Sequence, residues 1–347
     1  MRKHDITLRP RAGVDDDPPD DENGAQLHYA FRLGGDFILD TPADPSPIWG
    51  EGEDVLLADG EALIIAGPQG LGKTTLAQQL LLGRAGFTEY STLLGFPIQA
   101  GQGTALYLAM DRPRQAARSF RRMVGDSWRD ELNNSVRVWQ GPPPQDLARL
   151  PALLARLCDQ AGADTVVVDS LKDAAVGLND DEVGAGYNRA RQHAVTAGVQ
   201  VIELHHIRKQ QGGRAATPTI DDVYGSTWLP SGAGSVILLT GAPGDPIVNL
   251  HHIKQPAAEV GPLKIIHDHT SGRSNVWQAT DLVVLAGQPG GLTALDAARA
   301  LFDVSKPDAN QKEKARRRLQ ALERKGDLVV FDPGHKPTNR PQVWGPK

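Results

Sequence analysis

Residues 67–74, Gly-Pro-Gln-Gly-Leu-Gly-Lys-Thr, constrain this chain more than any other stretch, because they match the spacing Gly-x-x-x-x-Gly-Lys-Ser/Thr. The apolar run 62–66 before them predicts a buried strand, and 73–83 predicts a helix. Between a strand and a helix, such a loop turns backbone N–H groups and the positive helix end toward an anion. The sequence therefore predicts a phosphate-binding loop (P-loop) made of Gly67, Pro68, Gln69, Gly70, Leu71, Gly72, Lys73, Thr74 and Thr75.

The P-loop also predicts which small molecules bind. In loops of this type the lysine reaches the β- and γ-phosphates of a nucleoside triphosphate, and the next hydroxyl holds Mg²⁺. We therefore expect ATP and Mg²⁺ as cofactors, with Lys73 on the phosphates and Thr74 on the metal. A chance match in a glycine-rich turn is the alternative, and the flanking strand and helix argue against it.

Length and composition narrow the class of protein. A chain of 347 residues has room for one large domain and a smaller one. Cys158 is the only cysteine, so no internal disulfide can form. The first residues carry no apolar segment typical of a secretory signal, and no stretch approaches the roughly 18 to 20 apolar residues of a membrane span. We expect a cytoplasmic protein that does not contact a membrane.

Charge is unevenly distributed along the chain. Residues 1–59 hold 14 acidic and 5 basic residues, whereas 305–347 hold 11 basic and 5 acidic ones. The basic end predicts contact with nucleic acid, although a plain solvated surface would explain both ends as well. Residues 1–25 include the acidic run 15–22 and are too polar to build a core, which predicts a disordered segment.

Short apolar runs and helical patterns alternate between residues 61 and 280. The strand candidates are 62–66, 104–109, 165–169, 199–204, 235–240, 247–252 and 263–267. The helix candidates are 73–83, 112–124, 147–161 and 182–197. Apolar strands that alternate with helices predict a largely parallel sheet covered on both faces. We therefore expect an α/β fold, with the ATP-binding domain over 26–280.

A second, smaller unit is expected at the C-terminal end. Residues 281–291 have the glycine and proline content of a linker. Within 292–347, helices are predicted at 293–302 and 309–325, followed by a strand at 327–331 and a return strand near Val343. This order is typical of a winged helix-turn-helix domain, whose second helix presents Lys314, Arg317 and Arg318 to DNA. A protein partner is the alternative ligand of this unit.

Two acids end predicted strands on the P-loop side of the sheet. Asp169 ends the run 165–169 and is expected to hold Mg²⁺ together with Thr74. Asp111 follows the strand 104–109 and is a candidate for orienting the attacking water. It is also a candidate N-cap of the helix after it, and the two roles are compatible.

A third strand ends in His205 and His206, which must point to opposite faces because neighbouring residues alternate along a strand. One of them can face the nucleotide. The long polar loop 208–224 follows directly and is expected to be functional, with Arg208, Lys209 and Arg214 giving it a positive first half; a plain disordered insertion is the alternative. His251, His252, His267 and His269 lie on later strands and are expected to be structural or exposed.

The order of Gly60-Glu61, the P-loop, the two acids, 205–209 and Gly225-Ser226 resembles the RecA-like core over about 45–280. The closer similarity is to the RepA-type and DnaB-type hexameric replicative helicases. This resemblance implies that His206 senses the γ-phosphate and that the loop 208–224 binds single-stranded DNA. Asp111 falls where the family usually has glutamate, one methylene longer.

The resemblance also implies a basic finger that acts on the nucleotide of a neighbouring subunit. Residues 230–234 contain no base, so Lys254 is the candidate. The resemblance thus implies a homo-oligomer, a hexamer in the family's manner, that works as an ATP-dependent DNA helicase of a phage or mobile element. The alternatives are a regulatory or loading ATPase that binds DNA without unwinding it, and a small-molecule kinase.

Overall fold

The computed structural model describes residues 33–208, 218–241, 247–268, 270–277, 282–287, 290–302, 304–332 and 341–346. The predicted disordered segment 1–25 and residues 209–217 of the polar loop, with Lys209 and Arg214, lie outside the described residues. The described residues before Pro45 form a unit of their own, which contains the short helix α1 (Gly34–Leu39) with no buried side chain.

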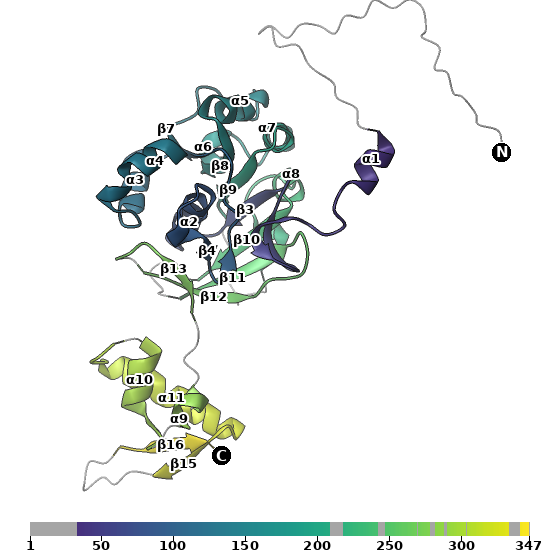
Figure 1. The fold of residues 1–347 in the computed structure, drawn as a ribbon. Helices are drawn as coiled ribbons and strands as arrows, with labels where there is room; N and C mark the ends of the chain where they lie inside the picture. Colours follow the sequence, from purple (N-terminus) through teal and green to yellow (C-terminus); the bar gives the residue numbers. More distant parts are fainter. Residues whose placement is uncertain are drawn as a thin grey trace, which may run out of the picture. The chain divides into compact units, whose positions relative to one another are not determined.

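Within the described residues, nine strands form one large sheet (Figure 1). In spatial order they are β13 (Ser274–Val276), β12 (Leu263–His267), β11 (Ile247–Lys254), β10 (Ser235–Thr240), β3 (Ala62–Ala66), β9 (Gln200–His205), β8 (Ala163–Asp169), β6 (Thr104–Ala109) and β7 (Val136–Gln140). The six from β10 to β7 run parallel, and β11, β12 and β13 extend the sheet antiparallel. The predicted α/β fold with a mostly parallel sheet is confirmed, and β3 with its P-loop lies near its middle.

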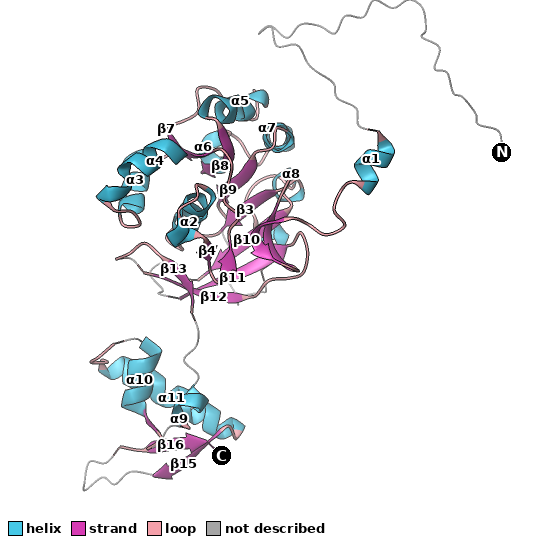
Figure 2. Cartoon of the chain, in the orientation of Figure 1, coloured by secondary structure: helices cyan, strands magenta, loops and turns pink. Residues whose placement is uncertain are grey.

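Helices cover both faces of this sheet (Figure 2). Strand β6 shows why: Tyr107 and Ala109 join a core with α2 (Lys73–Arg84) and α3 (Pro113–Arg121), whereas Leu106 and Leu108 join a second core. The second core holds α5 (Ala152–Ala161), α6 (Leu171–Ala174), α7 (Asp181–Thr196) and α8 (Trp228–Ser231). A strand that is apolar on both sides therefore sits between two helix layers. No helix in the described part of the chain is long and apolar enough to cross a membrane.

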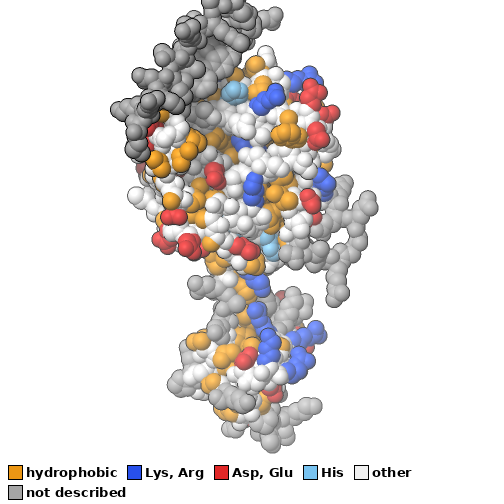
Figure 3. Space-filling model, turned by 90° about the vertical axis from the view of Figure 1, so that its right-hand side faces the viewer, with side chains coloured by type: hydrophobic (Ala, Val, Ile, Leu, Met, Phe, Trp, Pro, Cys, Tyr) orange, Lys and Arg blue, Asp and Glu red, His pale blue; other side chains and the backbone are white. Residues whose placement is uncertain are grey.

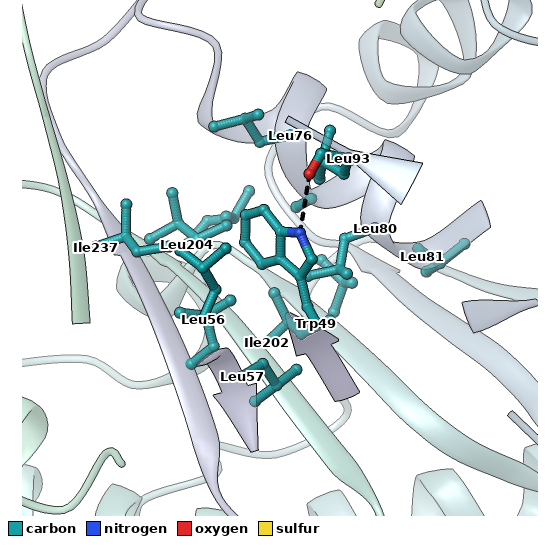
Figure 4. Packing of buried hydrophobic residues seen from close by; sticks show 14 of the residues in the cluster. Trp49, Leu56, Leu57, Leu76, Leu80, Leu81, Leu93, Ile202, Leu204 and Ile237 are labelled. Atoms are coloured by element: carbon teal, nitrogen blue, oxygen red, sulfur yellow. Dashed lines mark hydrogen bonds between the residues drawn. The ribbon is translucent and has the colours of Figure 1, made fainter. Parts of the chain in front are cut away.

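The hairpin of β1 (Pro47–Glu51) and β2 (Asp54–Ala58) packs on the α2 side of the sheet. Its Trp49 is fully buried, and the indole Nε1 donates to the carbonyl oxygen of Leu93 at 3.1 Å (Figure 4). The indole thus fills core volume while its one polar atom is satisfied.

Several predicted boundaries shift for local reasons. Helix α3 starts at Pro113 and not at 112, because proline suits the first helical position. Helix α5 starts at Ala152 and not at 147, because the Asp146 carboxylate accepts from the N–H groups of Ala148 and Arg149 and forms a turn there. The edge strand β7 escaped prediction, since three of its five residues are exposed.

Shorter elements complete the core. They are η1 (Thr88–Tyr90), β4 (Thr92–Leu93), β5 (Phe96–Pro97), η2 (Asp126–Trp128), α4 (Arg129–Ser135) and η3 (Ile220–Asp222).

The C-terminal residues build an apolar cluster of their own around the buried Trp344. Its elements are α9 (Leu282–Ala286), β14 (Leu292–Thr293), α10 (Ala294–Phe302), α11 (Ala309–Lys325), β15 (Leu328–Asp332) and β16 (Val343–Pro346). A capping box of Asp308 and Gln311 starts α11, and Gly326 ends it in the left-handed conformation. Helix positions 309–325 thus match the sequence prediction residue for residue. The domain boundaries at 26, 281 and 292 stay predictions.

Candidate nucleotide-binding site

The P-loop connects the end of β3 with the start of α2. The Gly67 N–H donates to the carbonyl oxygen of His205 at 3.3 Å, which ties the start of the loop to the end of β9. Gly72 is the N-cap of α2 and has a φ of +83°, a backbone conformation that only glycine adopts without strain. Residue 72 therefore places no Cβ atom beside the backbone amides at the N-terminus of α2. An anion-binding loop needs these amides to be accessible.

Lys73 lies folded over this loop. Its Nζ donates to the carbonyl oxygens of Gly67 at 2.8 Å and Pro68 at 2.7 Å. Burial lowers the pKa of Lys73 to about 8, and the nearby carboxylate of Asp169 opposes this shift. A desolvated ammonium held on two neutral carbonyls is well suited to gain an anionic partner.

Asp169 and Thr74 meet at the ends of β8 and the P-loop. The Thr74 hydroxyl lies 3.2 Å from Oδ2 of Asp169, and the Tyr107 hydroxyl donates to the same oxygen. Burial raises the pKa of Asp169, while the bonds from Tyr107 and Thr74 and the charge of Lys73 act against the rise. A hydroxyl and a carboxylate are oxygen donors of the kind that Mg²⁺ takes in phosphate sites, so this pair fits the metal that the P-loop implies.

Asp111 lies at the same edge but is exposed to solvent. Its carboxylate pairs with Nε of Arg112 at 3.1 Å. The prediction that Asp111 caps the following helix is wrong, because Arg112 holds the N-cap position of α3 and no side chain caps the helix. Proline at the first helical position shifts the helix start by one residue, so the carboxylate is left available for chemistry.

Asp111→Asn should lower the rate of ATP turnover by about 10²-fold or more and leave the Kd of ATP within about twofold, because it removes a base that acts on water. Steady-state kinetics and a fluorescence titration measure the two quantities. Asp126→Asn is the matched control, since Asp126 is also exposed and pairs with Arg121 at 2.7 Å. Equal turnover in the two variants would remove Asp111 from the reaction.

His205 and His206, at the end of β9, differ in burial, as expected for neighbouring residues that point to opposite faces of a strand. His205 is fully buried and its Nε2 lies 2.6 Å from the carbonyl oxygen of Tyr224. Burial lowers the pKa of His205 to about 4, so it is neutral at physiological pH. His206 is half-buried, and its pKa is lowered by burial and by the charges of Lys73 and Lys172. The charge of Lys73 acts on both histidines, and for His206 it is the largest influence after burial, whereas for His205 it is a lesser one.

Both ends of the polar loop 208–224 are fastened beside His206. The Tyr224 N–H donates to the carbonyl oxygen of His206 at 3.1 Å, and Ile207 and Val223 form an isolated β-bridge. The Arg208 guanidinium donates to the carbonyl oxygen of Gly225 at 3.0 Å. Arg208, expected on DNA, therefore also closes the base of the loop.

Lys254 lies at the edge where the parallel strands begin, whereas the P-loop lies where they end. Its Nζ donates to the carbonyl oxygens of Pro230 at 3.3 Å and Ser231 at 2.8 Å, just before β10. Burial lowers the pKa of Lys254, and the charge of Glu61, which precedes β3, acts against this shift. Lys254 is thus remote from the nucleotide site of its own chain, and any action on ATP has to be on a neighbouring subunit.

The later histidines divide into two groups. His252 is buried and bonded to Ser235, and His251 is half-buried and bonded to Thr240, so both are structural as expected. His267 is also held by hydrogen bonds, but its partner is the P-loop: its Nε2 lies 3.0 Å from the carbonyl oxygen of Leu71. No local pattern marks this residue, because 196 positions separate the two partners. His269 lies outside the described residues.

The predicted duplex-binding residues lie on α11. Arg317 and Arg318 are exposed, and Arg317 pairs with Glu313 at 3.0 Å. Figure 3 shows Lys and Arg side chains gathered on one face of the C-terminal unit. The side chain of Lys314 lies outside the described part of the structure.

Comparison with known proteins agrees with this geometry. A family model described as an AAA domain matches residues 33–212, more than half of the chain. The protein therefore belongs to the AAA domain family and is a P-loop ATPase with a RecA-like core, a class that binds nucleotides, usually with Mg²⁺. Among solved structures, a KaiC-like protein of the hyperthermophilic archaeon Pyrococcus horikoshii is similar at 16% identity and a TM-score of 0.46, over 68% of this chain and 100% of that one. No curated protein matches the chain.

Proposed function

We propose that this protein is an ATP-dependent motor on DNA, a RepA-like replicative helicase of a phage or mobile element. One observation carries the proposal: the two ends of the loop 208–224 are joined at His206, whose imidazole has Lys73 as an electrostatic neighbour. Any movement of the P-loop lysine on nucleotide binding or release changes the field at His206. Since the loop 208–224 is bonded to His206, a change of nucleotide at the P-loop is transmitted to the loop through this residue.

In this proposal each residue of the site has its own role in ATP binding, hydrolysis or coupling to DNA. Lys73 leaves its two carbonyl partners and neutralises phosphate charge, while Thr74 and Asp169 hold Mg²⁺. Asp111 orients the attacking water. Bound ATP supplies the phosphoanhydride bond whose hydrolysis releases the energy for movement. His206 then passes the loss of charge to the loop, where Arg208, Lys209 and Arg214 contact single-stranded DNA.

The proposed motor is a homo-oligomer, a hexameric ring in the manner of the helicases that the sequence resembles. Lys254 supports this arrangement, because it lies at the opposite strand edge from the P-loop of its own chain. A lysine placed there serves catalysis only on a neighbouring subunit. The C-terminal unit, with two helices followed by a β-hairpin and exposed Arg317 and Arg318, is proposed to be a winged helix that binds duplex DNA.

A regulatory or loading ATPase that binds DNA without unwinding it is the second candidate function. The exposure of Asp111 and its pairing with Arg112 favour it, because a shorter acid held by a neighbouring cation positions water less firmly. In that case the nucleotide state switches assembly and hydrolysis is slow.

Single-stranded DNA should accelerate ATP hydrolysis by the wild-type protein, and His206→Ala should lose this acceleration while it keeps the basal rate within about threefold. The reason is that the proposed route to the loop runs through the His206 imidazole, whereas the bonds of Lys73 to Gly67 and Pro68 do not involve it. His193→Ala is the control, since His193 is exposed on α7. Acceleration that persists in His206→Ala contradicts the proposed route.

Strand displacement from a forked duplex distinguishes the two candidate functions, because the helicase displaces the strand and the loading ATPase does not.

A further inference from the structure

His267 joins the last residues of β12 to the P-loop, although none of the roles above is assigned to it. Its Nε2 lies 3.0 Å from the carbonyl oxygen of Leu71, and its Nδ1 lies 2.8 Å from the Ser274 hydroxyl. Ser274 begins β13, so the contact draws the β12–β13 hairpin onto the phosphate-binding loop.

The hydrogen bonds around His267 fix which nitrogen carries the proton. A carbonyl oxygen only accepts, so Nε2 of His267 donates to Leu71. Nδ1 then accepts from the hydroxyl of Ser274, whose oxygen in turn accepts from Nε2 of Gln79 at 2.8 Å. Oε1 of the same Gln79 accepts from the Ser274 N–H at 3.0 Å. Every donor in this hydrogen-bond network has an acceptor, so the network holds the imidazole in one orientation against the P-loop.

The orientation of one peptide group in the P-loop follows from this bond. The peptide between Leu71 and Gly72 is planar and trans, so its C=O and N–H point in opposite directions. Because His267 binds the Leu71 oxygen, the Gly72 N–H of the same peptide points away from His267. Gly72 is also the residue at the N-terminus of α2, where backbone amides face a bound phosphate.

The close approach of the imidazole also explains why residue 72 is glycine. A Cβ atom at this position would lie 2.1 Å from Nε2 of His267. The ring therefore packs directly on the backbone of Gly72. The turn between β12 and β13 is fixed as well, since the Arg273 guanidinium lies over the Tyr90 ring, 4.8 Å from its centroid.

We propose that His267 is a positioning residue for nucleotide binding: its Nε2–H holds the Leu71 carbonyl so that the Gly72 N–H faces the phosphate. The proposal rests on nucleotide binding at the P-loop. The amide in question contacts the phosphates that ATP and ADP share, so the effect is uniform on both ligands. It strengthens binding without acting on the step of bond cleavage.

Two substitutions separate the hydrogen bond from packing. His267→Phe keeps a ring against Gly72 and loses the donor, and it should raise the Kd of both ATP and ADP about tenfold, the size expected for one hydrogen bond to a charged group. His267→Gln keeps an N–H donor and should bind within about threefold of wild type. At saturating ATP, kcat of both variants should equal that of wild type. His251→Phe is the matched control, because His251 bonds to Thr240 on a neighbouring strand and not to the P-loop.

The titrations use fluorescent nucleotides and the full chain, with circular dichroism to confirm folding. Wild-type affinity in His267→Phe, or equal loss in the Phe and Gln variants, would overturn the inference and leave nucleotide binding intact. A wild-type protein without affinity for ATP would overturn the nucleotide assignment, and this inference with it. Should His267→Phe fail to fold, Ser274→Ala gives the second test: it removes the hydroxyl that fixes the imidazole and should raise both Kd values by a common factor, whereas unchanged Kd values would overturn the inference.

Discussion

Lys73→Ala should lower the rate of ATP hydrolysis by about 10³-fold, the size seen when one preorganised charge-stabilising group is removed from an active site. The variant should fold normally, because the ammonium contributes a desolvated charge bonded to the neutral carbonyl oxygens of Gly67 and Pro68. Its removal relieves a burial cost, so the melting temperature should stay the same or rise. Phosphate release under saturating ATP and thermal unfolding measure the two effects.

The control for this variant is Lys172→Ala. Lys172 is exposed on α6 and acts on His206 through its charge, but it is not bonded to the P-loop. It should keep hydrolysis within about threefold of wild type. If Lys73→Ala hydrolysed ATP as fast as Lys172→Ala, the P-loop of this chain would not be its catalytic centre.

Local patterns were enough to predict the frame that carries the site. Strands β3, β6, β10 and β12 have the predicted bounds, because each is a short run of mostly apolar or β-branched residues that begins directly after a polar residue, a glycine or a proline. The glycine spacing of 67–74 predicts the P-loop for the same reason, since the backbone conformation and the residue types are set within eight positions. Because parallel strands end at one edge of the sheet, the sequence also predicted that Asp169 and Thr74 lie close together. In the structure the Thr74 hydroxyl is 3.2 Å from the Asp169 carboxylate.

What escaped prediction depends on contacts between distant parts of the chain. His267 acquires its place on the P-loop only because the antiparallel strands fold back beside β10, and no spacing in the sequence encodes this. The engagement of Lys254 by the carbonyl oxygens before β10 is of the same kind. The prediction that Asp111 is the N-cap of α3 was wrong for a local reason. Proline at position 113 favours a helix start there, which makes Arg112 the N-cap.

The buried ion pair of Arg191 and Glu203 is the second place where one substitution should have a large effect. Both side chains are almost completely inaccessible, and Nη2 of Arg191 lies 2.7 Å from Oε2 of Glu203. Arg191 also donates to the carbonyl oxygen of Leu229 at 2.9 Å, and the Tyr187 hydroxyl donates to Glu203 at 2.9 Å. The pair therefore connects α7, α8 and β9, two residues before His205.

Arg191→Met should lower the free energy of unfolding by about 3–5 kcal/mol, because it leaves the Glu203 carboxylate buried without its charge partner. Urea unfolding followed by tryptophan fluorescence measures this. Replacing both partners, in Arg191→Met/Glu203→Met, should recover a large part of the loss, since no uncompensated charge then remains in the core. Arg316→Ala removes one partner of an exposed pair with Glu313 and should leave the urea midpoint unchanged. If Arg191→Met unfolded at the midpoint of Arg316→Ala, the buried pair would not stabilise the sheet edge that carries His205 and His206.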